Sequence, residues 1–256
     1  MRIIFCWMIL FMAFCLAAQG LASEITIWDN QASATGNSFH TSMDEDQEVE
    51  PSAVADSAWD LEGMFYENGI LSIVGEWNFI GTLSNIGSGD IFISTTGSAI
   101  YGSSITSSST NTLITNSFGY NYVFDVDWES YSEQYGYGTY YLRKIDETTL
   151  LNSTQLGSGN PASYAGGDDE GLIYVGQFTF TQTDEVDYTG TTHYMVSNFD
   201  LTQIPGFTDT FIAHFTQECG NDVIMGQVPE PATMLLLGMG LLGISAIGKK
   251  LPFKNG

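Results

Sequence analysis

Two short clusters of acidic side chains are the residues in this chain best suited to bind a metal ion. The first is Asp44, Glu45, Asp46 and Glu48, and the second is Asp168, Asp169 and Glu170. Both lie in turn-rich stretches, and Ca²⁺ prefers several oxygen ligands from carboxylates and backbone carbonyls. Neither cluster has the spacing of an EF-hand. We therefore expect either a calcium site or a solvated acidic loop at each of them.

The three histidines, His40, His193 and His214, are the next candidates for chemistry. His40 lies in a polar stretch, and the alternation around the other two places them on outward strand faces. No pair of them has metal-ligand spacing, and no nucleophile elbow or Ser/His/Asp order stands out. A glycosidase would need two carboxylates across a groove, and the sequence singles out no such pair. We expect exposed histidines and no enzymatic activity.

Aromatic residues offer a different chemistry, the binding of sugars. The chain holds 13 tyrosines, most of which alternate toward the inside of the expected strands. Tyr135-Gly136-Tyr137-Gly138 is the pair best placed for exposure, because glycines separate the two rings. Exposed aromatic rings beside a few polar groups are typical of ligand sites and could stack on sugar rings. Core packing is the alternative for the other tyrosines.

The positions that bear these residues fit strands. In residues 120–128, apolar side chains alternate with Asp125 and Asp127, which share the opposite face. Those two carboxylates could share an ion or simply face solvent. Similar alternation recurs in the stretches that contain Leu172, Tyr174, Phe178 and Phe180, Tyr194 and Val196, Phe211 to Phe215, and Trp59 to Phe65, where Asp60 and Glu62 take the other face. Such period-2 patterns predict half-buried strands.

Glycine-rich turns divide the strand patterns, and Asn68-Gly69 between two apolar runs predicts a tight hairpin. No stretch of ten residues has a helical stripe. The sequence predicts an all-β fold like a β-sandwich or jelly roll, with an apolar layer between two sheets. The hydroxyl-rich segment from Ser103 to Ser117 could be a long loop of one sandwich or a linker between two small domains.

The charge of the region between the two ends of the chain restricts its partners. Between residues 24 and 228, two basic residues, Arg143 and Lys144, face 29 acidic ones, which leaves a net charge of −27. Such a surface repels nucleic acid and anionic lipid and attracts divalent cations. Cys219 is the only cysteine of this region, so it forms no disulfide within the region. We expect it to be a small buried residue or to pair with another molecule.

Both ends of the chain look like targeting segments. Residues 1–22 have a basic start, an apolar core and small residues before a cleavage point, as a secretory signal peptide has. Residues 232–248 form an apolar run that would reach roughly 25 Å as a helix, enough to span a thin membrane. Lys249 and Lys250 follow, and positive charge stays in the cytoplasm. The acidic β-domain, residues 23–227, would then lie outside the inner membrane.

The tail from residue 228 to residue 254 resembles a known sorting signal. Pro229, Glu230 and Pro231 precede the apolar run, which is rich in Leu and Gly and ends at the two lysines. This order is similar to that of PEP-CTERM proteins. The resemblance implies that exosortase, a membrane-embedded protease, cuts the tail after transient anchoring in the inner membrane. It also implies a final location at the cell surface or in the extracellular matrix.

These features together favour an exported cell-surface or extracellular-matrix protein with a structural or adhesive role, which Ca²⁺ could bridge to its neighbours. The alternative is a carbohydrate-binding module of the exopolysaccharide matrix. A hydrolase is less favoured. So is an ice-binding protein, because Thr179, Thr181 and Thr183 make one row of threonines and no second row repeats it.

Overall fold

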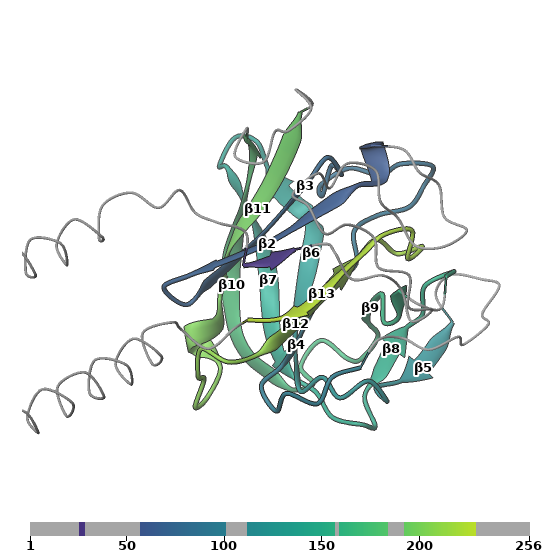
Figure 1. Cartoon of the computed structure of the whole chain (residues 1–256), viewed down its shortest axis with the longest axis vertical. Coiled ribbons are helices and arrows are strands. Elements are labelled where there is room, and N and C mark those ends of the chain that lie inside the picture. The colour runs from purple at the N-terminus through teal and green to yellow at the C-terminus, as the bar shows by residue number, and fades with distance from the viewer. Residues whose placement is uncertain (1–25, 29–56, 101–111, 157–158, 184–191, 229–256) are drawn as a thin grey trace, which may run out of the picture.

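The computed structural model of this chain describes residues 26–28, 57–100, 112–156, 159–183 and 192–228 (Figure 1). They contain strands and two 3₁₀ helices, η1 (Ser57–Trp59) and η3 (Leu201–Gln203). The strands are β1 (Ile27–Trp28), β2 (Leu61–Glu67), β3 (Ile70–Gly75), β4 (Ile91–Ser94), β5 (Leu113–Thr115), β6 (Tyr122–Ser132), β7 (Tyr137–Lys144), β8 (Leu150–Asn152), β9 (Ser163–Tyr164), β10 (Leu172–Thr183), β11 (His193–Asp200), β12 (Ile212–Thr216) and β13 (Val223–Gln227).

One antiparallel sheet of ten strands makes up most of the described structure, in the order β1-β2-β3-β11-β10-β7-β6-β4-β12-β13. The long strand β10 joins its two halves, because residues up to Phe178 pair with β7 and residues from Thr179 pair with β11. The two edges of the sheet also meet. The Leu61 amide at the start of β2 donates to Asp222 Oδ2, next to β13, at 2.7 Å. The sheet therefore curls around a single interior.

The interior is filled by the inward faces of both halves of the sheet. Its largest fully buried side chains are aromatic: Trp77, Phe79, Phe124, Tyr140, Phe178, Phe199, Phe211 and Phe215. The expected all-β fold is confirmed. The two expected layers are the halves of one continuous sheet rather than separate sheets. The 12-residue strand β10 connects them, because one part of it pairs with β7 and the other with β11.

A second sheet, in the order β5-β8-β9, covers the outer face of part of the first (Figure 1, lower right). Leu151 of β8 packs with Phe92 of β4, and Val223 and Met225 of β13 belong to the same apolar cluster. In this region the ten-stranded sheet is therefore buried on both faces. β5 also lies within the segment from Ser103 to Ser117, so the described part of that segment includes a strand.

The structure overturns the prediction that His193 and His214 are exposed. Both side chains are fully buried. His214 packs against two rings of the apolar cluster under the second sheet, Phe92 and Tyr120, and its Nε2 is 3.0 Å from the carbonyl oxygen of Pro161. His193 Nε2 lies 3.1 Å from Glu62 Oε1 inside the protein. Period-2 alternation identifies the two faces of a strand, but a face that another element covers is not a solvent face.

Two bulges account for further differences from the expected alternation. A register shift between Leu61 and Gly63 adds Glu62 to β2, and both Asp60 and Glu62 are buried instead of facing solvent. A second shift, between Leu172 and Tyr174, turns Ile173 toward the core. Tyr174 keeps the face of Phe178, because the pairs with β7 are regular from Tyr174 to Phe178, yet both Leu172 and Tyr174 are exposed. A bulge moves side chains from one face to the other.

Other expectations are confirmed or lie outside the described residues. Asn68 and Gly69 form the turn between β2 and β3 with φ angles of 52° and 87°, as the hairpin pattern predicts. Cys219 is half-buried, and burial raises the pKa of its thiol. The segments 1–22 and 232–248, the cluster Asp44 to Glu48 and His40 lie outside the described residues. Among the residues that are described, no helix is long and apolar enough to cross a membrane.

Candidate functional site: an aromatic groove where the two halves of the sheet part

An open groove of about 630 Å³ lies where β10 leaves β11 and turns toward β7. Its walls are Ile70, Tyr135, Gly136, Tyr137, Thr139, Tyr140, Tyr174, Val175, Gly176, Gln177, Thr179, Asn198 and Asp200. These residues come from β3, β7, β10 and β11 and from the turn between β6 and β7. The groove therefore depends on the whole arrangement of the sheet, and not on one loop.

The groove opens because β10 and β11 stop pairing. Their last pair in this direction is Thr179 with Ser197, and the next residue, Asn198, has a left-handed φ of 76° at a bulge in β11. Further along β11, the Asp200 amide donates instead to the hydroxyl of Tyr140 at 3.2 Å. The side chain of Tyr140 thus replaces the missing backbone partner and forms the floor of the groove.

Gly176 and Tyr140 fit each other closely on this floor. A Cβ atom at Gly176 would lie 2.1 Å from Tyr140 Cζ, so any other residue would displace the ring. Burial raises the pKa of Tyr140 to about 12, and its hydroxyl keeps its proton at neutral pH. The floor is therefore an uncharged aromatic ring, which packs against Gly176 and accepts a hydrogen bond from the Asp200 amide.

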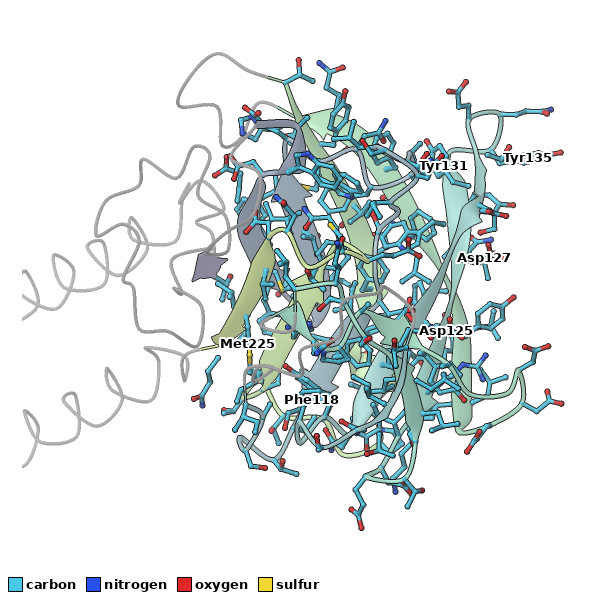
Figure 2. The ribbon with its side chains drawn as sticks, turned by 90° about the vertical axis from the view of Figure 1, so that its right-hand side faces the viewer. Phe118, Asp125, Asp127, Tyr131, Tyr135 and Met225 are labelled. Carbon is cyan, nitrogen blue, oxygen red and sulfur yellow. The ribbon has the colours of Figure 1, made fainter. Side chains whose placement is uncertain are left out.

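Three further tyrosines surround the opening with their rings accessible to a ligand. Tyr135 is 65% exposed, Tyr137 38% and Tyr174 37%. The rings of Tyr135 and Tyr137 are 6.0 Å apart between centroids, with an angle of 33° between their planes. Ser132 O accepts hydrogen bonds from the amides of Tyr135 and Gly136, which fixes the turn that carries Tyr135. Figure 2 shows Tyr135 at the edge of the molecule, pointing away from the sheet.

Uncharged polar groups accompany the rings. Gln177 lies opposite Thr139 on the neighbouring strand, and both side chains line the groove. Asn198 Nδ2 donates to Thr179 Oγ1 at 3.3 Å. Asp200 is the one carboxylate among the described lining residues, and its oxygens accept bonds from Thr202 and Gln203. Amides and hydroxyls beside exposed rings suit a ligand with many hydroxyl groups.

The exposure expected for Tyr135 and Tyr137 is confirmed, whereas the role of Tyr174 was not visible in the sequence. The glycines beside Tyr135 and Tyr137 indicate an exposed turn, and this signal is local in the sequence. Tyr174 lies on the same face of β10 as Gly176, and it lines the groove in the part of β10 that does not pair with β11. The long-range splitting of β10 from β11 is equally hidden.

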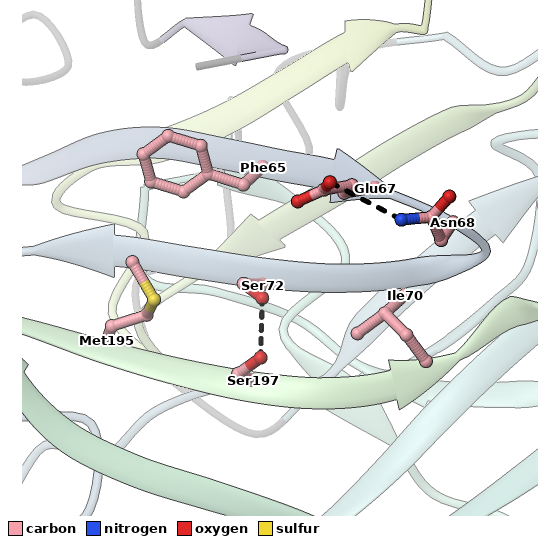
Figure 3. Close-up of a pocket in the computed structure, with 7 residues that line it drawn as sticks. All are labelled: Phe65, Glu67, Asn68, Ile70, Ser72, Met195 and Ser197. Atoms are coloured by element: carbon pink, nitrogen blue, oxygen red, sulfur yellow. Dashed lines mark hydrogen bonds between the residues drawn. The ribbon is translucent and has the colours of Figure 1, made fainter. Parts of the chain in front are cut away.

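A smaller hollow of about 400 Å³ lies on the outer face of β2, β3 and β11 (Figure 3). Its one aromatic residue, Phe65, is 5% exposed and packs against Val74 and Met195. Ser72 and Ser197 bond to each other through their hydroxyls at 2.7 Å. With its ring buried and these hydroxyls paired, this hollow offers less to a ligand than the groove does.

The acidic cluster at Asp168, Asp169 and Glu170 is exposed, and its backbone carbonyls face an arginine. Arg143 Nη1 donates to the carbonyl oxygens of Gly167, Asp168 and Glu170 at 3.4, 2.5 and 3.1 Å. A guanidinium group thus lies where these carbonyls converge. Within the described ranges, no three His, Cys, Asp or Glu side chains are grouped to hold a metal ion. Calcium binding at this cluster stays a prediction.

Asp125 and Asp127 follow one another along β6 but have different partners (Figure 2). Asp125 Oδ2 accepts from Arg143 Nε at 2.8 Å, and Asp127 Oδ1 accepts from the Ser130 amide at 3.1 Å. Burial raises the pKa of Asp125, while the hydrogen bond from Arg143 acts in the opposite direction. Each carboxylate has its own structural contact.

Comparison with known proteins identifies the tail alone. Residues 227–250 match the PEP-CTERM protein-sorting motif, as the order of Pro229, Glu230, Pro231 and the apolar run predicts. This motif implies export, passage through the membrane, processing by exosortase and sorting to the cell surface. The chain matches no curated protein and no solved structure. Gln227 and Val228 are the only residues of the motif region that are described, and Val228 is buried.

Proposed function

We propose that this protein is a surface or extracellular-matrix component that adheres to exopolysaccharide through the aromatic groove. Its role is structural and adhesive, without catalysis. The sorting motif supports the location, and the groove supports the partner. The observation that carries the proposal is the arrangement of Tyr135, Tyr137 and Tyr174 around one opening, with their rings exposed.

Adhesion requires a site that binds a polymer without changing it chemically, and the groove offers contacts of that kind. The polar groups of the groove, Gln177, Thr139 and Asn198, can exchange hydrogen bonds with sugar hydroxyls. The tyrosine rings supply apolar contact area while their hydroxyls remain wet. Weak sites of this kind become strong when many copies bind one polymer, which suits a matrix.

The double substitution Tyr135→Ala and Tyr137→Ala tests the groove. We expect roughly tenfold weaker binding to a polysaccharide, since two ring contacts are worth about 1–3 kcal/mol together. Retention on polysaccharide gels would measure it. Leu113→Ala, which trims a side chain that is 58% exposed on β5 and away from the groove, is the matched control. Equal retention of both variants and of the unaltered chain would contradict the proposal.

The sorting motif has its own test. Glu230→Ala should leave the full-length protein in the inner membrane, because the charged residue between the two prolines is part of the matched motif. Fractionation of cells with an antibody against the β-domain would measure it. Glu170→Ala removes an equal charge outside the motif and should leave sorting unchanged. Normal release of the Glu230→Ala variant would refute processing through this motif.

Calcium is the second part of the proposal. Asp44, Glu45, Asp46 and Glu48, together with Asp168, Asp169 and Glu170, would supply carboxylates that bridge one strongly anionic domain to another or to the polymer. The net charge of −27 between residues 24 and 228 supports a cation-dependent assembly.

A further inference from the structure

The charges around the groove restrict which polysaccharide it can hold, an inference that rests on the proposed function. Among the described residues that line it, none is basic, and Asp200 contributes a carboxylate. The rest of the region between residues 24 and 228 cannot correct this, because it contains only Arg143 and Lys144 as basic residues. This count of basic residues comes from the sequence, so it covers every segment of that region.

Neither basic residue lines the groove. Arg143 is 3% exposed and is committed to Asp125 and to the carbonyls of the turn at residues 167–170. Lys144 ends β7, seven residues from Tyr137, which corresponds to roughly 24 Å along a strand. From the Tyr137 end, that separation exceeds the distance of about 8 Å over which charges act in physiological salt. Near Tyr174, which pairs with Leu142, Lys144 alternates to the face of β7 opposite that of Thr139 and Gln177.

The groups that do face the groove are suited to uncharged partners. Gln177, Asn198, Thr139 and Thr179 carry amides and hydroxyls, which both donate and accept hydrogen bonds as sugar hydroxyls do. The buried phenol of Tyr140 beneath them remains neutral. A carboxylate or sulfate on the ligand would meet the charge of Asp200 without any cation to offset it.

We infer that the groove binds an uncharged polysaccharide and rejects polyuronates and sulfated glycans. An anionic polymer would reach the strongly acidic region between residues 24 and 228 through a bridging cation elsewhere on its surface. The selectivity comes from the absence of a cation at the groove, and one substitution should therefore change it.

The test compares gels of uncharged polysaccharides (β-glucan, galactomannan and agarose) with a polyuronate gel, using the full chain in neutral detergent with EDTA at physiological salt. We expect retention on at least one uncharged gel, about tenfold weaker after Tyr135→Ala with Tyr137→Ala. Tail lysines can bind polyuronate without the groove, so only retention that the tyrosine substitutions abolish counts as groove binding. Gln177→Lys should create such retention on polyuronate, while Lys144→Gln should change neither gel.

The outcomes separate the two ideas. Tyrosine-dependent retention of the unaltered chain on polyuronate would overturn the charge selectivity and leave glycan binding in place. Failure to bind any gel, or binding indifferent to Tyr135 and Tyr137, would overturn glycan binding by the groove and this inference with it. Tyrosine-dependent retention on uncharged gels alone, extended to polyuronate by Gln177→Lys, supports the inference.

Discussion

His214 is an imidazole buried between the ten-stranded sheet and the smaller sheet. Burial lowers its pKa from 6.5 to about 4, against the opposing effect of the backbone around Pro161 and Gly159. Pro161 O can only accept, so Nε2 carries the proton of the neutral ring. The folded protein therefore holds this side chain uncharged at neutral pH.

Stability should fall as the pH drops from 6.5 to 4. In this window the unfolded chain protonates His214 and the folded protein does not, so the unfolded state binds more protons. The contribution is fully present above pH 6.5, and its loss amounts to about 3 kcal/mol by pH 4. Urea unfolding of the unaltered chain and of His214→Gln, which can still donate to Pro161, would measure it. An identical pH slope in the two proteins would contradict this assignment.

Arg143 is a second residue whose contribution to the free energy of unfolding can be measured. Its guanidinium bonds to Asp125 and three carbonyls and lies 5.4 Å from the ring centre of Tyr141 and 5.0 Å from that of Tyr164. Arg143→Met should lower the free energy of unfolding by about 3–5 kcal/mol, because Asp125 loses its partner and the carbonyls lose their donor. Lys144→Met, at the exposed neighbour, should change it by less than about 0.5 kcal/mol. Equal effects in denaturant titrations would refute this role.

At the scale of elements, two nearby glycines differ in what surrounds them. A Cβ at Gly89 would lie 2.3 Å from Ala162 O and 2.7 Å from Thr216 O, two backbone atoms that cannot rotate away. At Gly87 the nearest atom, on the Glu218 side chain, would be 3.6 Å away. Gly89 therefore allows the segment before β9 to pack against β12.

Gly89→Ala should cost about 1–3 kcal/mol of stability through overpacking, whereas Gly87→Ala should stay within about 0.5 kcal/mol. Thermal unfolding of both variants measures the difference. A Gly89→Ala protein as stable as Gly87→Ala would show that the contact between the smaller sheet and β12 yields easily.

The sequence predicts where the strands lie better than it predicts which distant segments pack against them. The alternation around Phe124 and Val126 predicts β6, and Asn68-Gly69 predicts its hairpin, because both signals are local. The burial of His193 and His214 depends on segments far away in the chain, which local alternation does not report. The groove shares this limit. Tyr135 and Tyr137 are marked by glycines, whereas the position of Tyr174 in the groove depends on the parting of β10 from β11.

At the scale of the whole molecule, the net charge of −27 between residues 24 and 228 opposes compaction. Millimolar CaCl₂ should raise the melting temperature more than NaCl of equal ionic strength, because a bound ion stabilises the folded state beyond screening. Substitution of Asp168, Asp169 and Glu170 by their amides should reduce the extra rise if this cluster binds the ion. Equal curves in the two salts would leave screening as the whole effect and refute calcium binding.

The described fold ends at Val228, next to the sorting motif at which exosortase processing is expected. Val228 is 4% exposed, and its amide donates to Phe211 O at 2.9 Å. The next residue, Pro229, has no amide hydrogen with which to extend that pairing. A cut anywhere beyond Val228 therefore removes none of the core side chains that the structure describes. A domain released by such a cut would keep every described strand and every residue that lines the groove.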